Sequence, residues 1–531
     1  MVTLHRWEID VERGAVSLVA DDVRRRFCRG AFLLLTAVRA LAPWPEGRAA
    51  EPEPYYHVVD ILSEQARQHS RHPQWQPGEG IAMEVTGMAV MDGDRVAVAI
   101  RKGEVWLLDN AYGDPEVIRY TRFASGLDEP LGLIVREGDL WTVQRSELTR
   151  LRDLDQDDVA DVYETAAKGW AVTGNYHGYA YGPVEDGNGD LWITLNLDIG
   201  GGDNSLPWHG WGLKLDRNGD LHPMCAGMRS PCGLGRNLDG DVFFTDQQGN
   251  WIPANSLHQL VPGAFYGNPD GLPPALDGST PLGRIPTNTA TLLQGKPYPE
   301  ALKLMPQLRP PAVWFPYRKM GQSRTDLVLD DTGGKFGPFE GQFFVGEFTQ
   351  SRIGRVFLET VDGEYQGACF PFHAGFPAGV MRLAFGRDGS LLVGMTNRGW
   401  SSVGGGTYGL QRLVWNGKTP FEIQEVRARP DGFELRFTQE VDRETASDVD
   451  SYRLSSYTYP LHSMYGAEEL ETKTLDVESA TLEADNRTVR LTVRSLRPFH
   501  VHELHCDGVR STEGSPLRHA EAYYTLNRIP K

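Results

Sequence analysis

The sequence has few cysteines, no stripe of basic residues and, beyond one segment near its start, no long hydrophobic stretch. Its five cysteines form no Cys-x-x-Cys-His motif, so the chain does not attach a c-type haem and any electron acceptor must be a separate molecule. A net charge of -18 without clustered lysine or arginine argues against nucleic acid as a partner. Outside the early segment, no stretch has the length and apolarity of a membrane-spanning helix.

Residues 24–50 have the pattern of an export signal, with a basic start, an apolar stretch and small residues at the end. Arg39 interrupts the apolar stretch and about twenty residues precede it, so we expect residues 1–50 to be a signal with an over-extended N-terminus. A buried amphipathic helix is the alternative. Export predicts a periplasmic or secreted protein, in which four cysteines can pair in a pattern that the sequence does not define: Cys225, Cys232, Cys369 and Cys506.

The chain is rich in turn residues, with 59 Gly and 34 Pro, and it contains a six-fold repeat. An Asp/Glu/Asn-Gly turn is followed each time by a short strand of aromatic and β-branched residues, and preceded by another apolar strand. Spacings of about 45 to 50 residues match a four-stranded propeller blade. The sequence therefore predicts an all-β protein with a six-bladed β-propeller over residues 51–415.

Two regions depart from the repeat. Residues 264–320 are Pro-rich, and because proline removes strand hydrogen-bond donors, we interpret them as a long insertion over one face rather than a seventh blade. Residues 416–531 contain six or so alternating strands, which predict an immunoglobulin- or fibronectin-like β-sandwich. We expect this sandwich to be an accessory domain.

In a propeller, the start of a blade's first strand and the end of its second share one rim of the central channel. Ionisable residues hold the first place in all six repeats: Glu84, Glu129, His177, Arg229, Arg324 and Arg382. Polar residues follow the second strands, among them Arg101, Arg145, Asn196, Asp246, Gln248, Glu347, Thr349, Asn397 and Arg398. Strand alternation does not require such residues, so we expect a binding or active site at this channel mouth.

His177 is the candidate general base, because imidazole titrates near neutral pH and can take a proton from a sugar hydroxyl. The alternative is a structural histidine bonded to the backbone of its Gly-containing turn. Glu84 and Glu129 are candidate acid–base partners. Four tryptophans are candidates for stacking on sugar rings: Trp208, Trp211, Trp251 and Trp400.

A second signal is an acidic loop whose carboxylates occupy positions 1, 3, 5, 9 and 12: Asp153, Asp155, Asp157, Asp161 and Glu164. Oxygen ligands at this spacing are typical of Ca²⁺ loops, although Asp158 replaces the usual glycine at position 6. A solvated acidic loop is the alternative. Because the loop follows the second repeat's strands, we expect a structural clip rather than a catalytic centre.

Residues from about 80 to 415 resemble the soluble glucose and sorbosone dehydrogenases, which use pyrroloquinoline quinone (PQQ) on a six-bladed propeller. The resemblance is carried by NYHGYAYGPVEDGNGDLWIT, AGMRSPCGLGRNLDGDVFFTDQQGN, LHQLVPGAFYG and RLAFGRDGSLLVG. The chain also resembles large exported propeller proteins of planctomycete-type bacteria, whose biochemical role is poorly defined.

The resemblance to the dehydrogenases implies that His177 removes the substrate's hydroxyl proton and that Arg229 holds and polarises the quinone. It implies a cofactor site that includes Arg382, Gln248, Thr349, Asn397 and Arg398, and a Ca²⁺ beside it at Gln248, Gly249 and Asn255. Two departures weaken quinone binding. Asp128-Glu129 stands in a family Gln-Gly motif, and Thr349 stands at the place of a cofactor-binding lysine.

We therefore expect an exported enzyme that oxidises a sugar or polyol hydroxyl with PQQ and Ca²⁺ and passes electrons to a separate acceptor. Its catalytic residues are His177, Arg229 and Glu129. One alternative is a Ca²⁺-dependent lactonase, lyase or hydrolase acting on carbohydrates at the same mouth. Another is a non-catalytic carbohydrate-binding propeller. In each case the partner is a sugar-like small molecule or a polysaccharide.

Overall fold

The computed structural model describes residues 55–62, 67–69, 81–200 and 202–531. The predicted export signal in residues 1–50 lies outside the described residues. None of the helices in the described part of the chain has the length and apolarity needed to cross a membrane.

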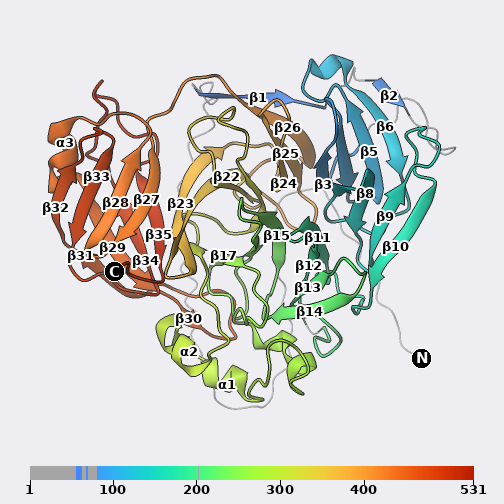
Figure 1. The fold of residues 1–531 in the computed structure, drawn as a ribbon, viewed down its shortest axis with the longest axis horizontal. Helices are drawn as coiled ribbons and strands as arrows, with labels where there is room; N and C mark the ends of the chain where they lie inside the picture. The colour runs from blue at the N-terminus through green and yellow to red at the C-terminus, as the bar shows by residue number, and fades with distance from the viewer. Residues whose placement is uncertain (1–54, 63–66, 70–80, 201) are drawn as a thin grey trace, which may run out of the picture. The chain divides into compact units, whose positions relative to one another are not determined.

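The first three repeats each form a four-stranded antiparallel blade (Figure 1). Blade one is β3 (Val85–Val90), β4 (Val96–Ile100), β5 (Glu104–Asp109) and β6 (Arg119–Ala124), with β2 (Arg67–His69) parallel to β6 at its edge. Blade two is β7 (Ile134–Arg136), β8 (Asp139–Val143), β9 (Glu147–Arg152) and β10 (Val162–Lys168). Blade three is β11 (Ala180–Glu185), β12 (Leu191–Leu195), β13 (Trp211–Leu215) and β14 (Leu221–Ala226).

The remaining blades complete the ring. Blade four is β15 (Pro231–Arg236), β16 (Val242–Asp246), β17 (Asn255–Gln259) and β19 (Val313–Phe315). Blade five is β20 (Arg324–Leu329), β21 (Phe343–Glu347), β22 (Arg352–Val361) and β23 (Glu364–Ala374). Blade six is β24 (Val380–Phe385), β25 (Leu391–Thr396), β26 (Tyr408–Trp415) and β1 (Tyr56–Asp60), so the first described strand closes the propeller against the last blade.

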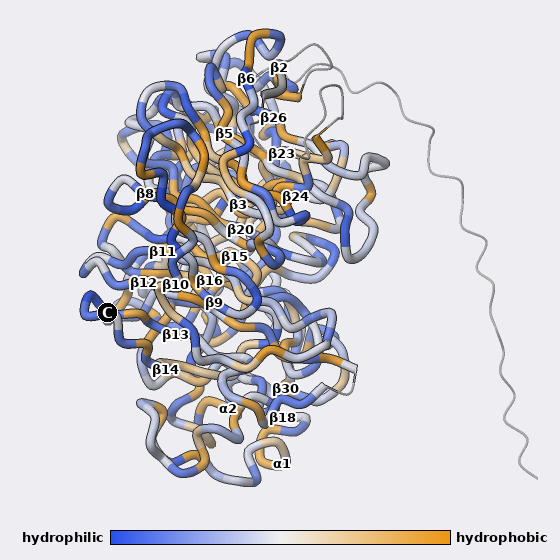
Figure 2. The backbone as a smooth tube through the Cα atoms, turned by 90° about the vertical axis from the view of Figure 1, so that its right-hand side faces the viewer, coloured by the Kyte–Doolittle hydropathy of each residue, from blue (hydrophilic) through white to orange (hydrophobic). Residues whose placement is uncertain are grey.

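The glycine of each repeat explains why the turn recurs. All six adopt positive φ, from 70° to 88°, which side chains disfavour: Gly93, Gly138, Gly189, Gly240, Gly341 and Gly389. The strands between the turns are apolar and buried, and Figure 2 shows hydrophobic residues along the inner strands β3, β15 and β20. The predicted six-bladed propeller is therefore confirmed.

The Pro-rich insertion adds no seventh blade within the described residues. It carries α1 (Thr289–Leu293), β18 (Lys296–Pro297), α2 (Tyr298–Leu304) and two 3₁₀ turns (Pro269–Gly271 and Pro273–Ala275), and it ends in β19, the outer strand of blade four. Pro297 in β18 pairs with Pro460 in β30 (Pro460–Leu461), which belongs to the C-terminal region. The insertion is thus anchored to the sandwich.

The C-terminal region is the predicted β-sandwich. One sheet is β27 (Ile423–Arg429), β28 (Gly432–Phe437), β33 (Thr488–Val493) and β32 (Val477–Leu482). The other is β35 (Glu521–Leu526), β34 (His500–His505), β29 (Arg453–Thr458) and β31 (Leu470–Leu475). Between the sheets lie Phe433 and Leu491 from the first and Leu454 and Leu504 from the second. A short helix, α3 (Arg443–Ser447), and a 3₁₀ turn (Val449–Ser451) connect β28 to β29.

The sandwich shares a sheet with the propeller. Strand β23 of blade five pairs with β35, with Gly367 opposite Thr525 and Cys369 opposite Tyr523, so the two form one eight-stranded sheet. The edge of blade five is thereby covered instead of exposed. Sequence periodicity finds strands but does not show which free edges will pair.

The four cysteines in the described chain are free, buried thiols, so none of the pairings that the sequence allowed is present. They lie on β14, β15, β23 and just after β34. Burial raises the pKa of the Cys225 and Cys369 thiols to about 12, because the apolar surroundings disfavour the thiolate.

Candidate functional site

The channel mouth has the geometry that the repeats predicted. The backbone N–H of Arg101 donates to the carbonyl of Glu84 (3.0 Å), and that of Asn196 donates to the carbonyl of Tyr179 (2.9 Å). In blade five, Arg324 at the start of β20 pairs with Glu347 at the end of β21. In each of these blades, the start of the first strand and the end of the second strand therefore lie at the same rim of the channel.

On one side of this rim, every charged side chain that we singled out is paired. Arg398 in blade six donates from Nε and Nη2 to the carboxylate of Glu84 in blade one, at 2.9 and 2.8 Å. Arg101 donates from Nε to Glu129 (3.0 Å), and Arg145 donates from Nη1 to the same carboxylate (2.8 Å). Glu129 therefore holds two arginines and is not free for acid–base chemistry.

Two of the six predicted mouth residues do not face the mouth. Arg324 is fully buried, donates to the carbonyls of Val345 and Met320 and lies 4.6 Å over the ring of Phe315. Burial lowers its pKa to about 10. Arg382 donates to the carbonyls of four residues on the inner strands and adjoining loops of several blades: Thr86, Leu131, Cys232 and Met381. Both guanidiniums therefore hold the channel walls together.

Arg382 also separates the mouth from the opposite end of the channel. A cavity of about 670 Å³ opens at that end and is lined by the second halves of the inner strands. Asp326 lines it beside Arg382, and burial raises the pKa of the Asp326 carboxyl to about 6. Four of the five N–H donors of Arg382 are used by backbone carbonyls, so the arrangement does not support the expected contact with a cofactor at the mouth.

The residues predicted after the last two second strands hold loops. Asn397 accepts from Gly379 N–H (3.1 Å) and donates to the carbonyls of Gly404 and Gly406. Thr349 accepts a hydrogen bond from the indole of Trp400 (3.3 Å). Glu347 accepts backbone N–H groups at both oxygens. Their polar atoms are therefore used inside the protein.

His177 lies on the other side of the rim and has a defined tautomer. Its Nδ1 lies 2.7 Å from the carbonyl of Leu197, which accepts only, so Nδ1 carries the proton and Nε2 has the free lone pair. No hydrogen bond to Nε2 comes from the described residues. Burial, together with the nearby charge of Arg229, lowers the pKa of His177 to about 4. At neutral pH the ring is an uncharged base.

Around His177 lies a group of buried polar atoms with no hydrogen-bond partner among the described residues. They are both side-chain polar atoms of Asn196, Oδ1 of Asp198, Nδ1 of His209 and Nε of Arg229. Asp198 Oδ1 is 3.8 Å from His209 Nδ1, too far for a hydrogen bond, while its Oδ2 accepts from Thr173 (2.7 Å). Buried polar groups usually have partners, so this group has room for hydrogen bonds with water or with a polar ligand.

A polar cavity of about 360 Å³ adjoins these groups. Its walls include Leu197, Asp198 and Arg229, together with Asn250, Asn268 and Asp270. Burial raises the pKa of the Asp270 carboxyl. His177 is not a lining residue and is only 5% exposed, but the carbonyl that fixes its ring belongs to the wall. Sequence reasoning missed Asp198 and Asp270, although Asp198 follows the polar end of β12.

Arg229 is held by Asp246 at its backbone and contacted by Tyr465 at its guanidinium. The Asp246 carboxylate accepts the backbone N–H groups of Arg229 (2.9 Å) and Ser230 (2.7 Å), and burial raises the pKa of Asp246 to about 6. The Arg229 guanidinium lies 5.3 Å from the ring centre of Tyr465, a residue of the sandwich. No feature of the sequence indicated that the C-terminal region reaches this site.

The Gln248–Asn255 loop, which the family resemblance assigned to Ca²⁺, is internally bonded. Oδ1 of Asn255 accepts the backbone N–H groups of Gln248 (3.4 Å) and Arg324 (3.1 Å). The Gln248 amide donates to the carbonyl of Pro253 (2.9 Å). An oxygen that faces two N–H groups is not available to a cation, so these residues do not fit Ca²⁺ as placed.

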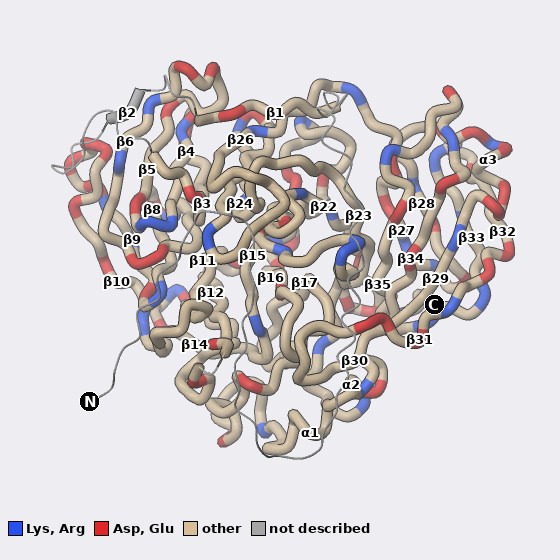
Figure 3. Tube along the Cα trace, turned by 180° about the vertical axis from the view of Figure 1, so that it is seen from behind, with Lys and Arg blue, Asp and Glu red and all other residues tan. Residues whose placement is uncertain are grey.

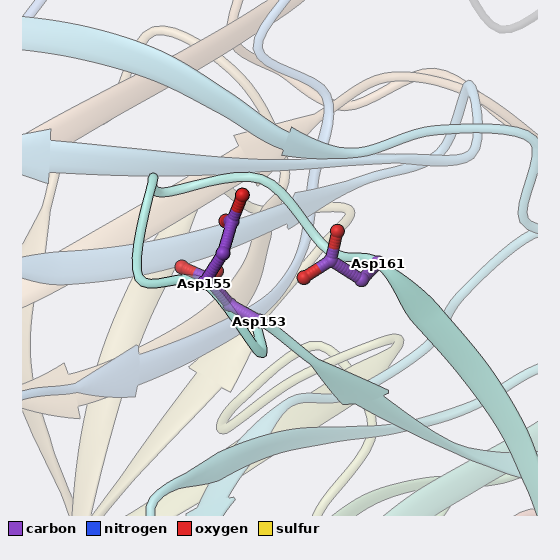
Figure 4. Close-up of side chains that lie close together, drawn as sticks. All are labelled: Asp153, Asp155 and Asp161. Carbon is purple, nitrogen blue, oxygen red and sulfur yellow. The ribbon is translucent and has the colours of Figure 1, made fainter.

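The acidic loop after β9 brings three of its five carboxylates together (Figure 4). Oxygens of Asp153, Asp155 and Asp161 lie within 4.8 Å of one another, while Asp157 and Glu164 are not part of this group. Asp158 adopts φ +67°, the conformation expected of the residue that replaces glycine, and binds Arg95 (2.6 Å). The loop is on blade two, away from the group around His177.

The predicted aromatic platform needs correction. Trp211 and Trp251 are buried core residues, with Trp211 donating to the carbonyl of Gly271 (2.7 Å), and Trp208 is half-buried against Trp211. Trp400 is 41% exposed. The large exposed aromatic residues nearest the His177 group are instead tyrosines: Tyr176 and Tyr465.

Comparisons with known proteins find the fold only. No protein-family model and no curated protein sequence matches the chain. Among solved structures, an oxidoreductase from Thermus thermophilus described as a glucose dehydrogenase is 17% identical, with a TM-score of 0.47 over 68% of this chain and 100% of that one. The PQQ-bound aldose sugar dehydrogenase of Streptomyces coelicolor is 14% identical (TM-score 0.44, 68% and 100%). The apo aldose sugar dehydrogenase of Escherichia coli is 13% identical (TM-score 0.45, 67% and 99%). Similarity at this level does not extend to activity, substrate or cofactor.

Proposed function

We propose that the protein is an enzyme that acts on a sugar, a polyol or a related polyhydroxy compound, with His177 as the general base. The observation that carries this proposal is the state of His177. Its Nδ1–H is fixed by the Leu197 carbonyl and its pKa is lowered to about 4. Nε2 is therefore unprotonated at neutral pH and is available to take a proton from a substrate. The cavity with unpartnered polar groups beside it suits a ligand with many hydroxyls.

The neighbouring residues have separate roles in this proposal. Arg229 is a fixed positive charge that stabilises an oxyanion as the proton leaves the substrate hydroxyl. The unpartnered oxygen of Asp198 and the amide of Asn196 orient further hydroxyls by accepting and donating hydrogen bonds. Water is restricted because each of these side chains is less than a tenth exposed.

The cofactor that the resemblance implies does not fit the residues as they are placed. PQQ carries three carboxylates and needs cations, but Arg101 and Arg145 are bound to Glu129, and Arg398 is bound to Glu84. Thr349 supplies no charge at the place of the family's lysine. Among the described residues, no carboxylate or carbonyl binds the guanidinium of Arg229, in contrast to Arg382 and Arg398, and Tyr465 lies over it.

Because the rim arginines are paired with Glu84 and Glu129 and are not free to bind a quinone, we favour a redox-neutral reaction, such as opening of a sugar lactone. There, His177 takes a proton from water as the oxygen adds to the carbonyl carbon, Arg229 stabilises the oxyanion, and the ring C–O bond breaks. The proton then passes from His177 to the alkoxide that leaves, so no oxidant is needed. PQQ-dependent oxidation of a sugar hydroxyl with a separate acceptor is the second candidate, favoured by the positions of His177 and Arg229 in the resembling motifs.

One experiment separates the two candidates. The purified protein is analysed for bound quinone and metal, then assayed on aldonolactones by acid release and on aldoses and alditols by dye reduction with added PQQ and Ca²⁺. We expect lactone opening without quinone and its loss in His177→Gln. Dye reduction that requires PQQ would replace the first candidate with the second, and no turnover of either panel would contradict the proposal that the protein is an enzyme of this kind.

The acidic loop and the early segment support two smaller proposals. We propose that Asp153, Asp155 and Asp161 hold a Ca²⁺ that clips the loop between β9 and β10, because their oxygens already converge. We also propose, from the sequence of residues 24–50 alone, that the protein is exported. N-terminal sequencing of the protein recovered from fractionated cells tests export, and an uncleaved N-terminus in the cytoplasm would contradict it.

A further inference from the structure

A segment of the C-terminal region lies against blade four at the channel mouth. Residues 462–467, which we call the mouth strap, follow β30 and lie against the loop of residues 249–253 in blade four. Trp251 N–H donates to the His462 carbonyl (2.9 Å), Gly466 N–H donates to the Gly249 carbonyl (3.0 Å), and Ala467 N–H donates to the Pro253 carbonyl (3.0 Å). These backbone bonds join the strap to blade four.

The fit between strap and propeller is close. A Cβ on Gly466 would come 2.7 Å from the Gln248 amide carbon, and Gly466 adopts φ +62°. A Cβ on Gly249 would lie 1.9 Å from Nε of Arg229. The Asn250 amide also donates to the Ser463 carbonyl (2.7 Å). The strap is therefore packed closely against the loop that contacts Arg229.

The strap places one aromatic ring at the site. The ring of Tyr465 is centred 5.3 Å from the Arg229 guanidinium carbon, yet Tyr465 is 64% exposed. A groove of about 760 Å³ also lies beside it, lined by Tyr465, Gln248, Tyr317, Tyr459 and His462. Its volume is in the range of small-ligand pockets, about 300 to 1,000 Å³.

We propose that Tyr465 is a substrate-contacting, specificity-determining residue of the His177 site, and that it selects a ring-form sugar over an open-chain polyol. This inference rests on the proposed function, which supplies the assumption that the ligand is sugar-like. A pyranose ring has a face of C–H groups that stacks on an aromatic ring, and its hydroxyls reach outward to polar groups. An open-chain polyol of the same carbon number has the hydroxyls but no such fixed face.

The chemistry on the two sides of Tyr465 supports this choice. Arg229 and the cavity with Asp198 and Asn250 offer charged and amide groups for hydroxyls, whereas the tyrosine offers an apolar face held in place by the arginine. A pyranose ring, with its C–H face and its outward hydroxyls, satisfies both, and an acyclic ligand satisfies only the first.

The test is binding, measured without turnover. Methyl pyranosides of glucose, galactose, mannose and xylose, and the four corresponding alditols, are titrated against the full chain by ligand-observed NMR. We expect at least one pyranoside to bind more tightly than its alditol, and Tyr465→Ala to lower that affinity by about fivefold, the size of one aromatic contact. Tyr465→Phe keeps the ring and should retain most of the affinity.

Tyr163→Ala is the matched control, because Tyr163 is 44% exposed on β10 of blade two. Unchanged thermal unfolding of Tyr465→Ala shows that its fold is intact. The proposal is overturned if the wild-type protein binds none of the pyranosides, or if Tyr465→Ala binds them as well as the wild type does. Tyr465-dependent binding with no turnover of lactones, aldoses or alditols would instead contradict the proposed function and leave this inference standing.

Discussion

On the side of the channel rim formed by blades six, one and two, the carboxylates of Glu84 and Glu129 are bound by arginines from the same side. On the side formed by blades three and four, buried polar atoms of Asn196, Asp198 and Arg229 have no partner among the described residues. Both sides carry similar polar residues in the sequence. The difference teaches that charge at a propeller rim marks a site only where the protein leaves it uncompensated, because a paired charge already has the partner that a ligand would supply.

Figure 3 shows acidic and basic residues interspersed along the described backbone, in the blades and in the sandwich alike.

The largest expected effect is a loss of activity on the side of the rim formed by blades three and four. His177→Ala should lower kcat/KM for the active substrate by about 10² to 10⁴, the usual contribution of a general base, with little change in thermal unfolding. Glu84→Gln, from the compensated side, is the control and should change kcat/KM far less. Equal losses in both variants would break the comparison between the two sides.

The pH dependence of activity sharpens the assignment of His177. The base is active only when unprotonated, so a pKa lowered to about 4 predicts kcat/KM that is flat through neutral pH and falls about tenfold per unit below pH 4. The measurement is kcat/KM against pH, with return to pH 7 to show that the protein has not unfolded. An acid limb near the ordinary histidine value of about 6.5 would contradict the buried, neutral imidazole.

On the side of the rim formed by blades six, one and two, where the charges are paired, the expected effect is on stability. Glu129→Gln leaves the side chains of Arg101 and Arg145, which are 13% and 15% exposed, without their carboxylate, and should lower the free energy of unfolding by about 1 to 3 kcal/mol. Glu84→Gln should cost less, since the Arg398 side chain is 47% exposed and water can solvate it. Denaturant unfolding of both variants provides the measurement, and a larger loss for Glu84→Gln would be inconsistent with this ranking.

The smallest expected effect concerns the acidic loop of blade two. Millimolar Ca²⁺ should stabilise the protein by about 1 kcal/mol, as expected for a loop that binds Ca²⁺ weakly. Thermal unfolding with Ca²⁺, Mg²⁺ or chelator measures the shift, and Asp153→Asn should abolish it. If Ca²⁺ raises the unfolding temperature no more than Mg²⁺ does, the loop is a solvated acidic turn.

Much of the fold was predictable because it depends on local, repeated chemistry. Glycines such as Gly189 and Gly240 recur at turns that require positive φ, and the apolar strands on either side give the period of a blade. The rim geometry followed from the same repeat. The candidate site was less predictable: His177 and Arg229 were found, but Arg324 and Arg382 have the same sequence signature and are buried among backbone carbonyls.

The sequence alone determined the six hairpin repeats, the sandwich that follows them and the set of polar residues at the strand ends, since each depends on residues close together in the chain. Only the tertiary structure decided which charges neutralise one another, that β35 extends blade five, and that Tyr465 lies over Arg229. These contacts join residues from different blades or from the sandwich. Their energies depend on distance, burial and free partners, none of which is written in the local pattern of residues.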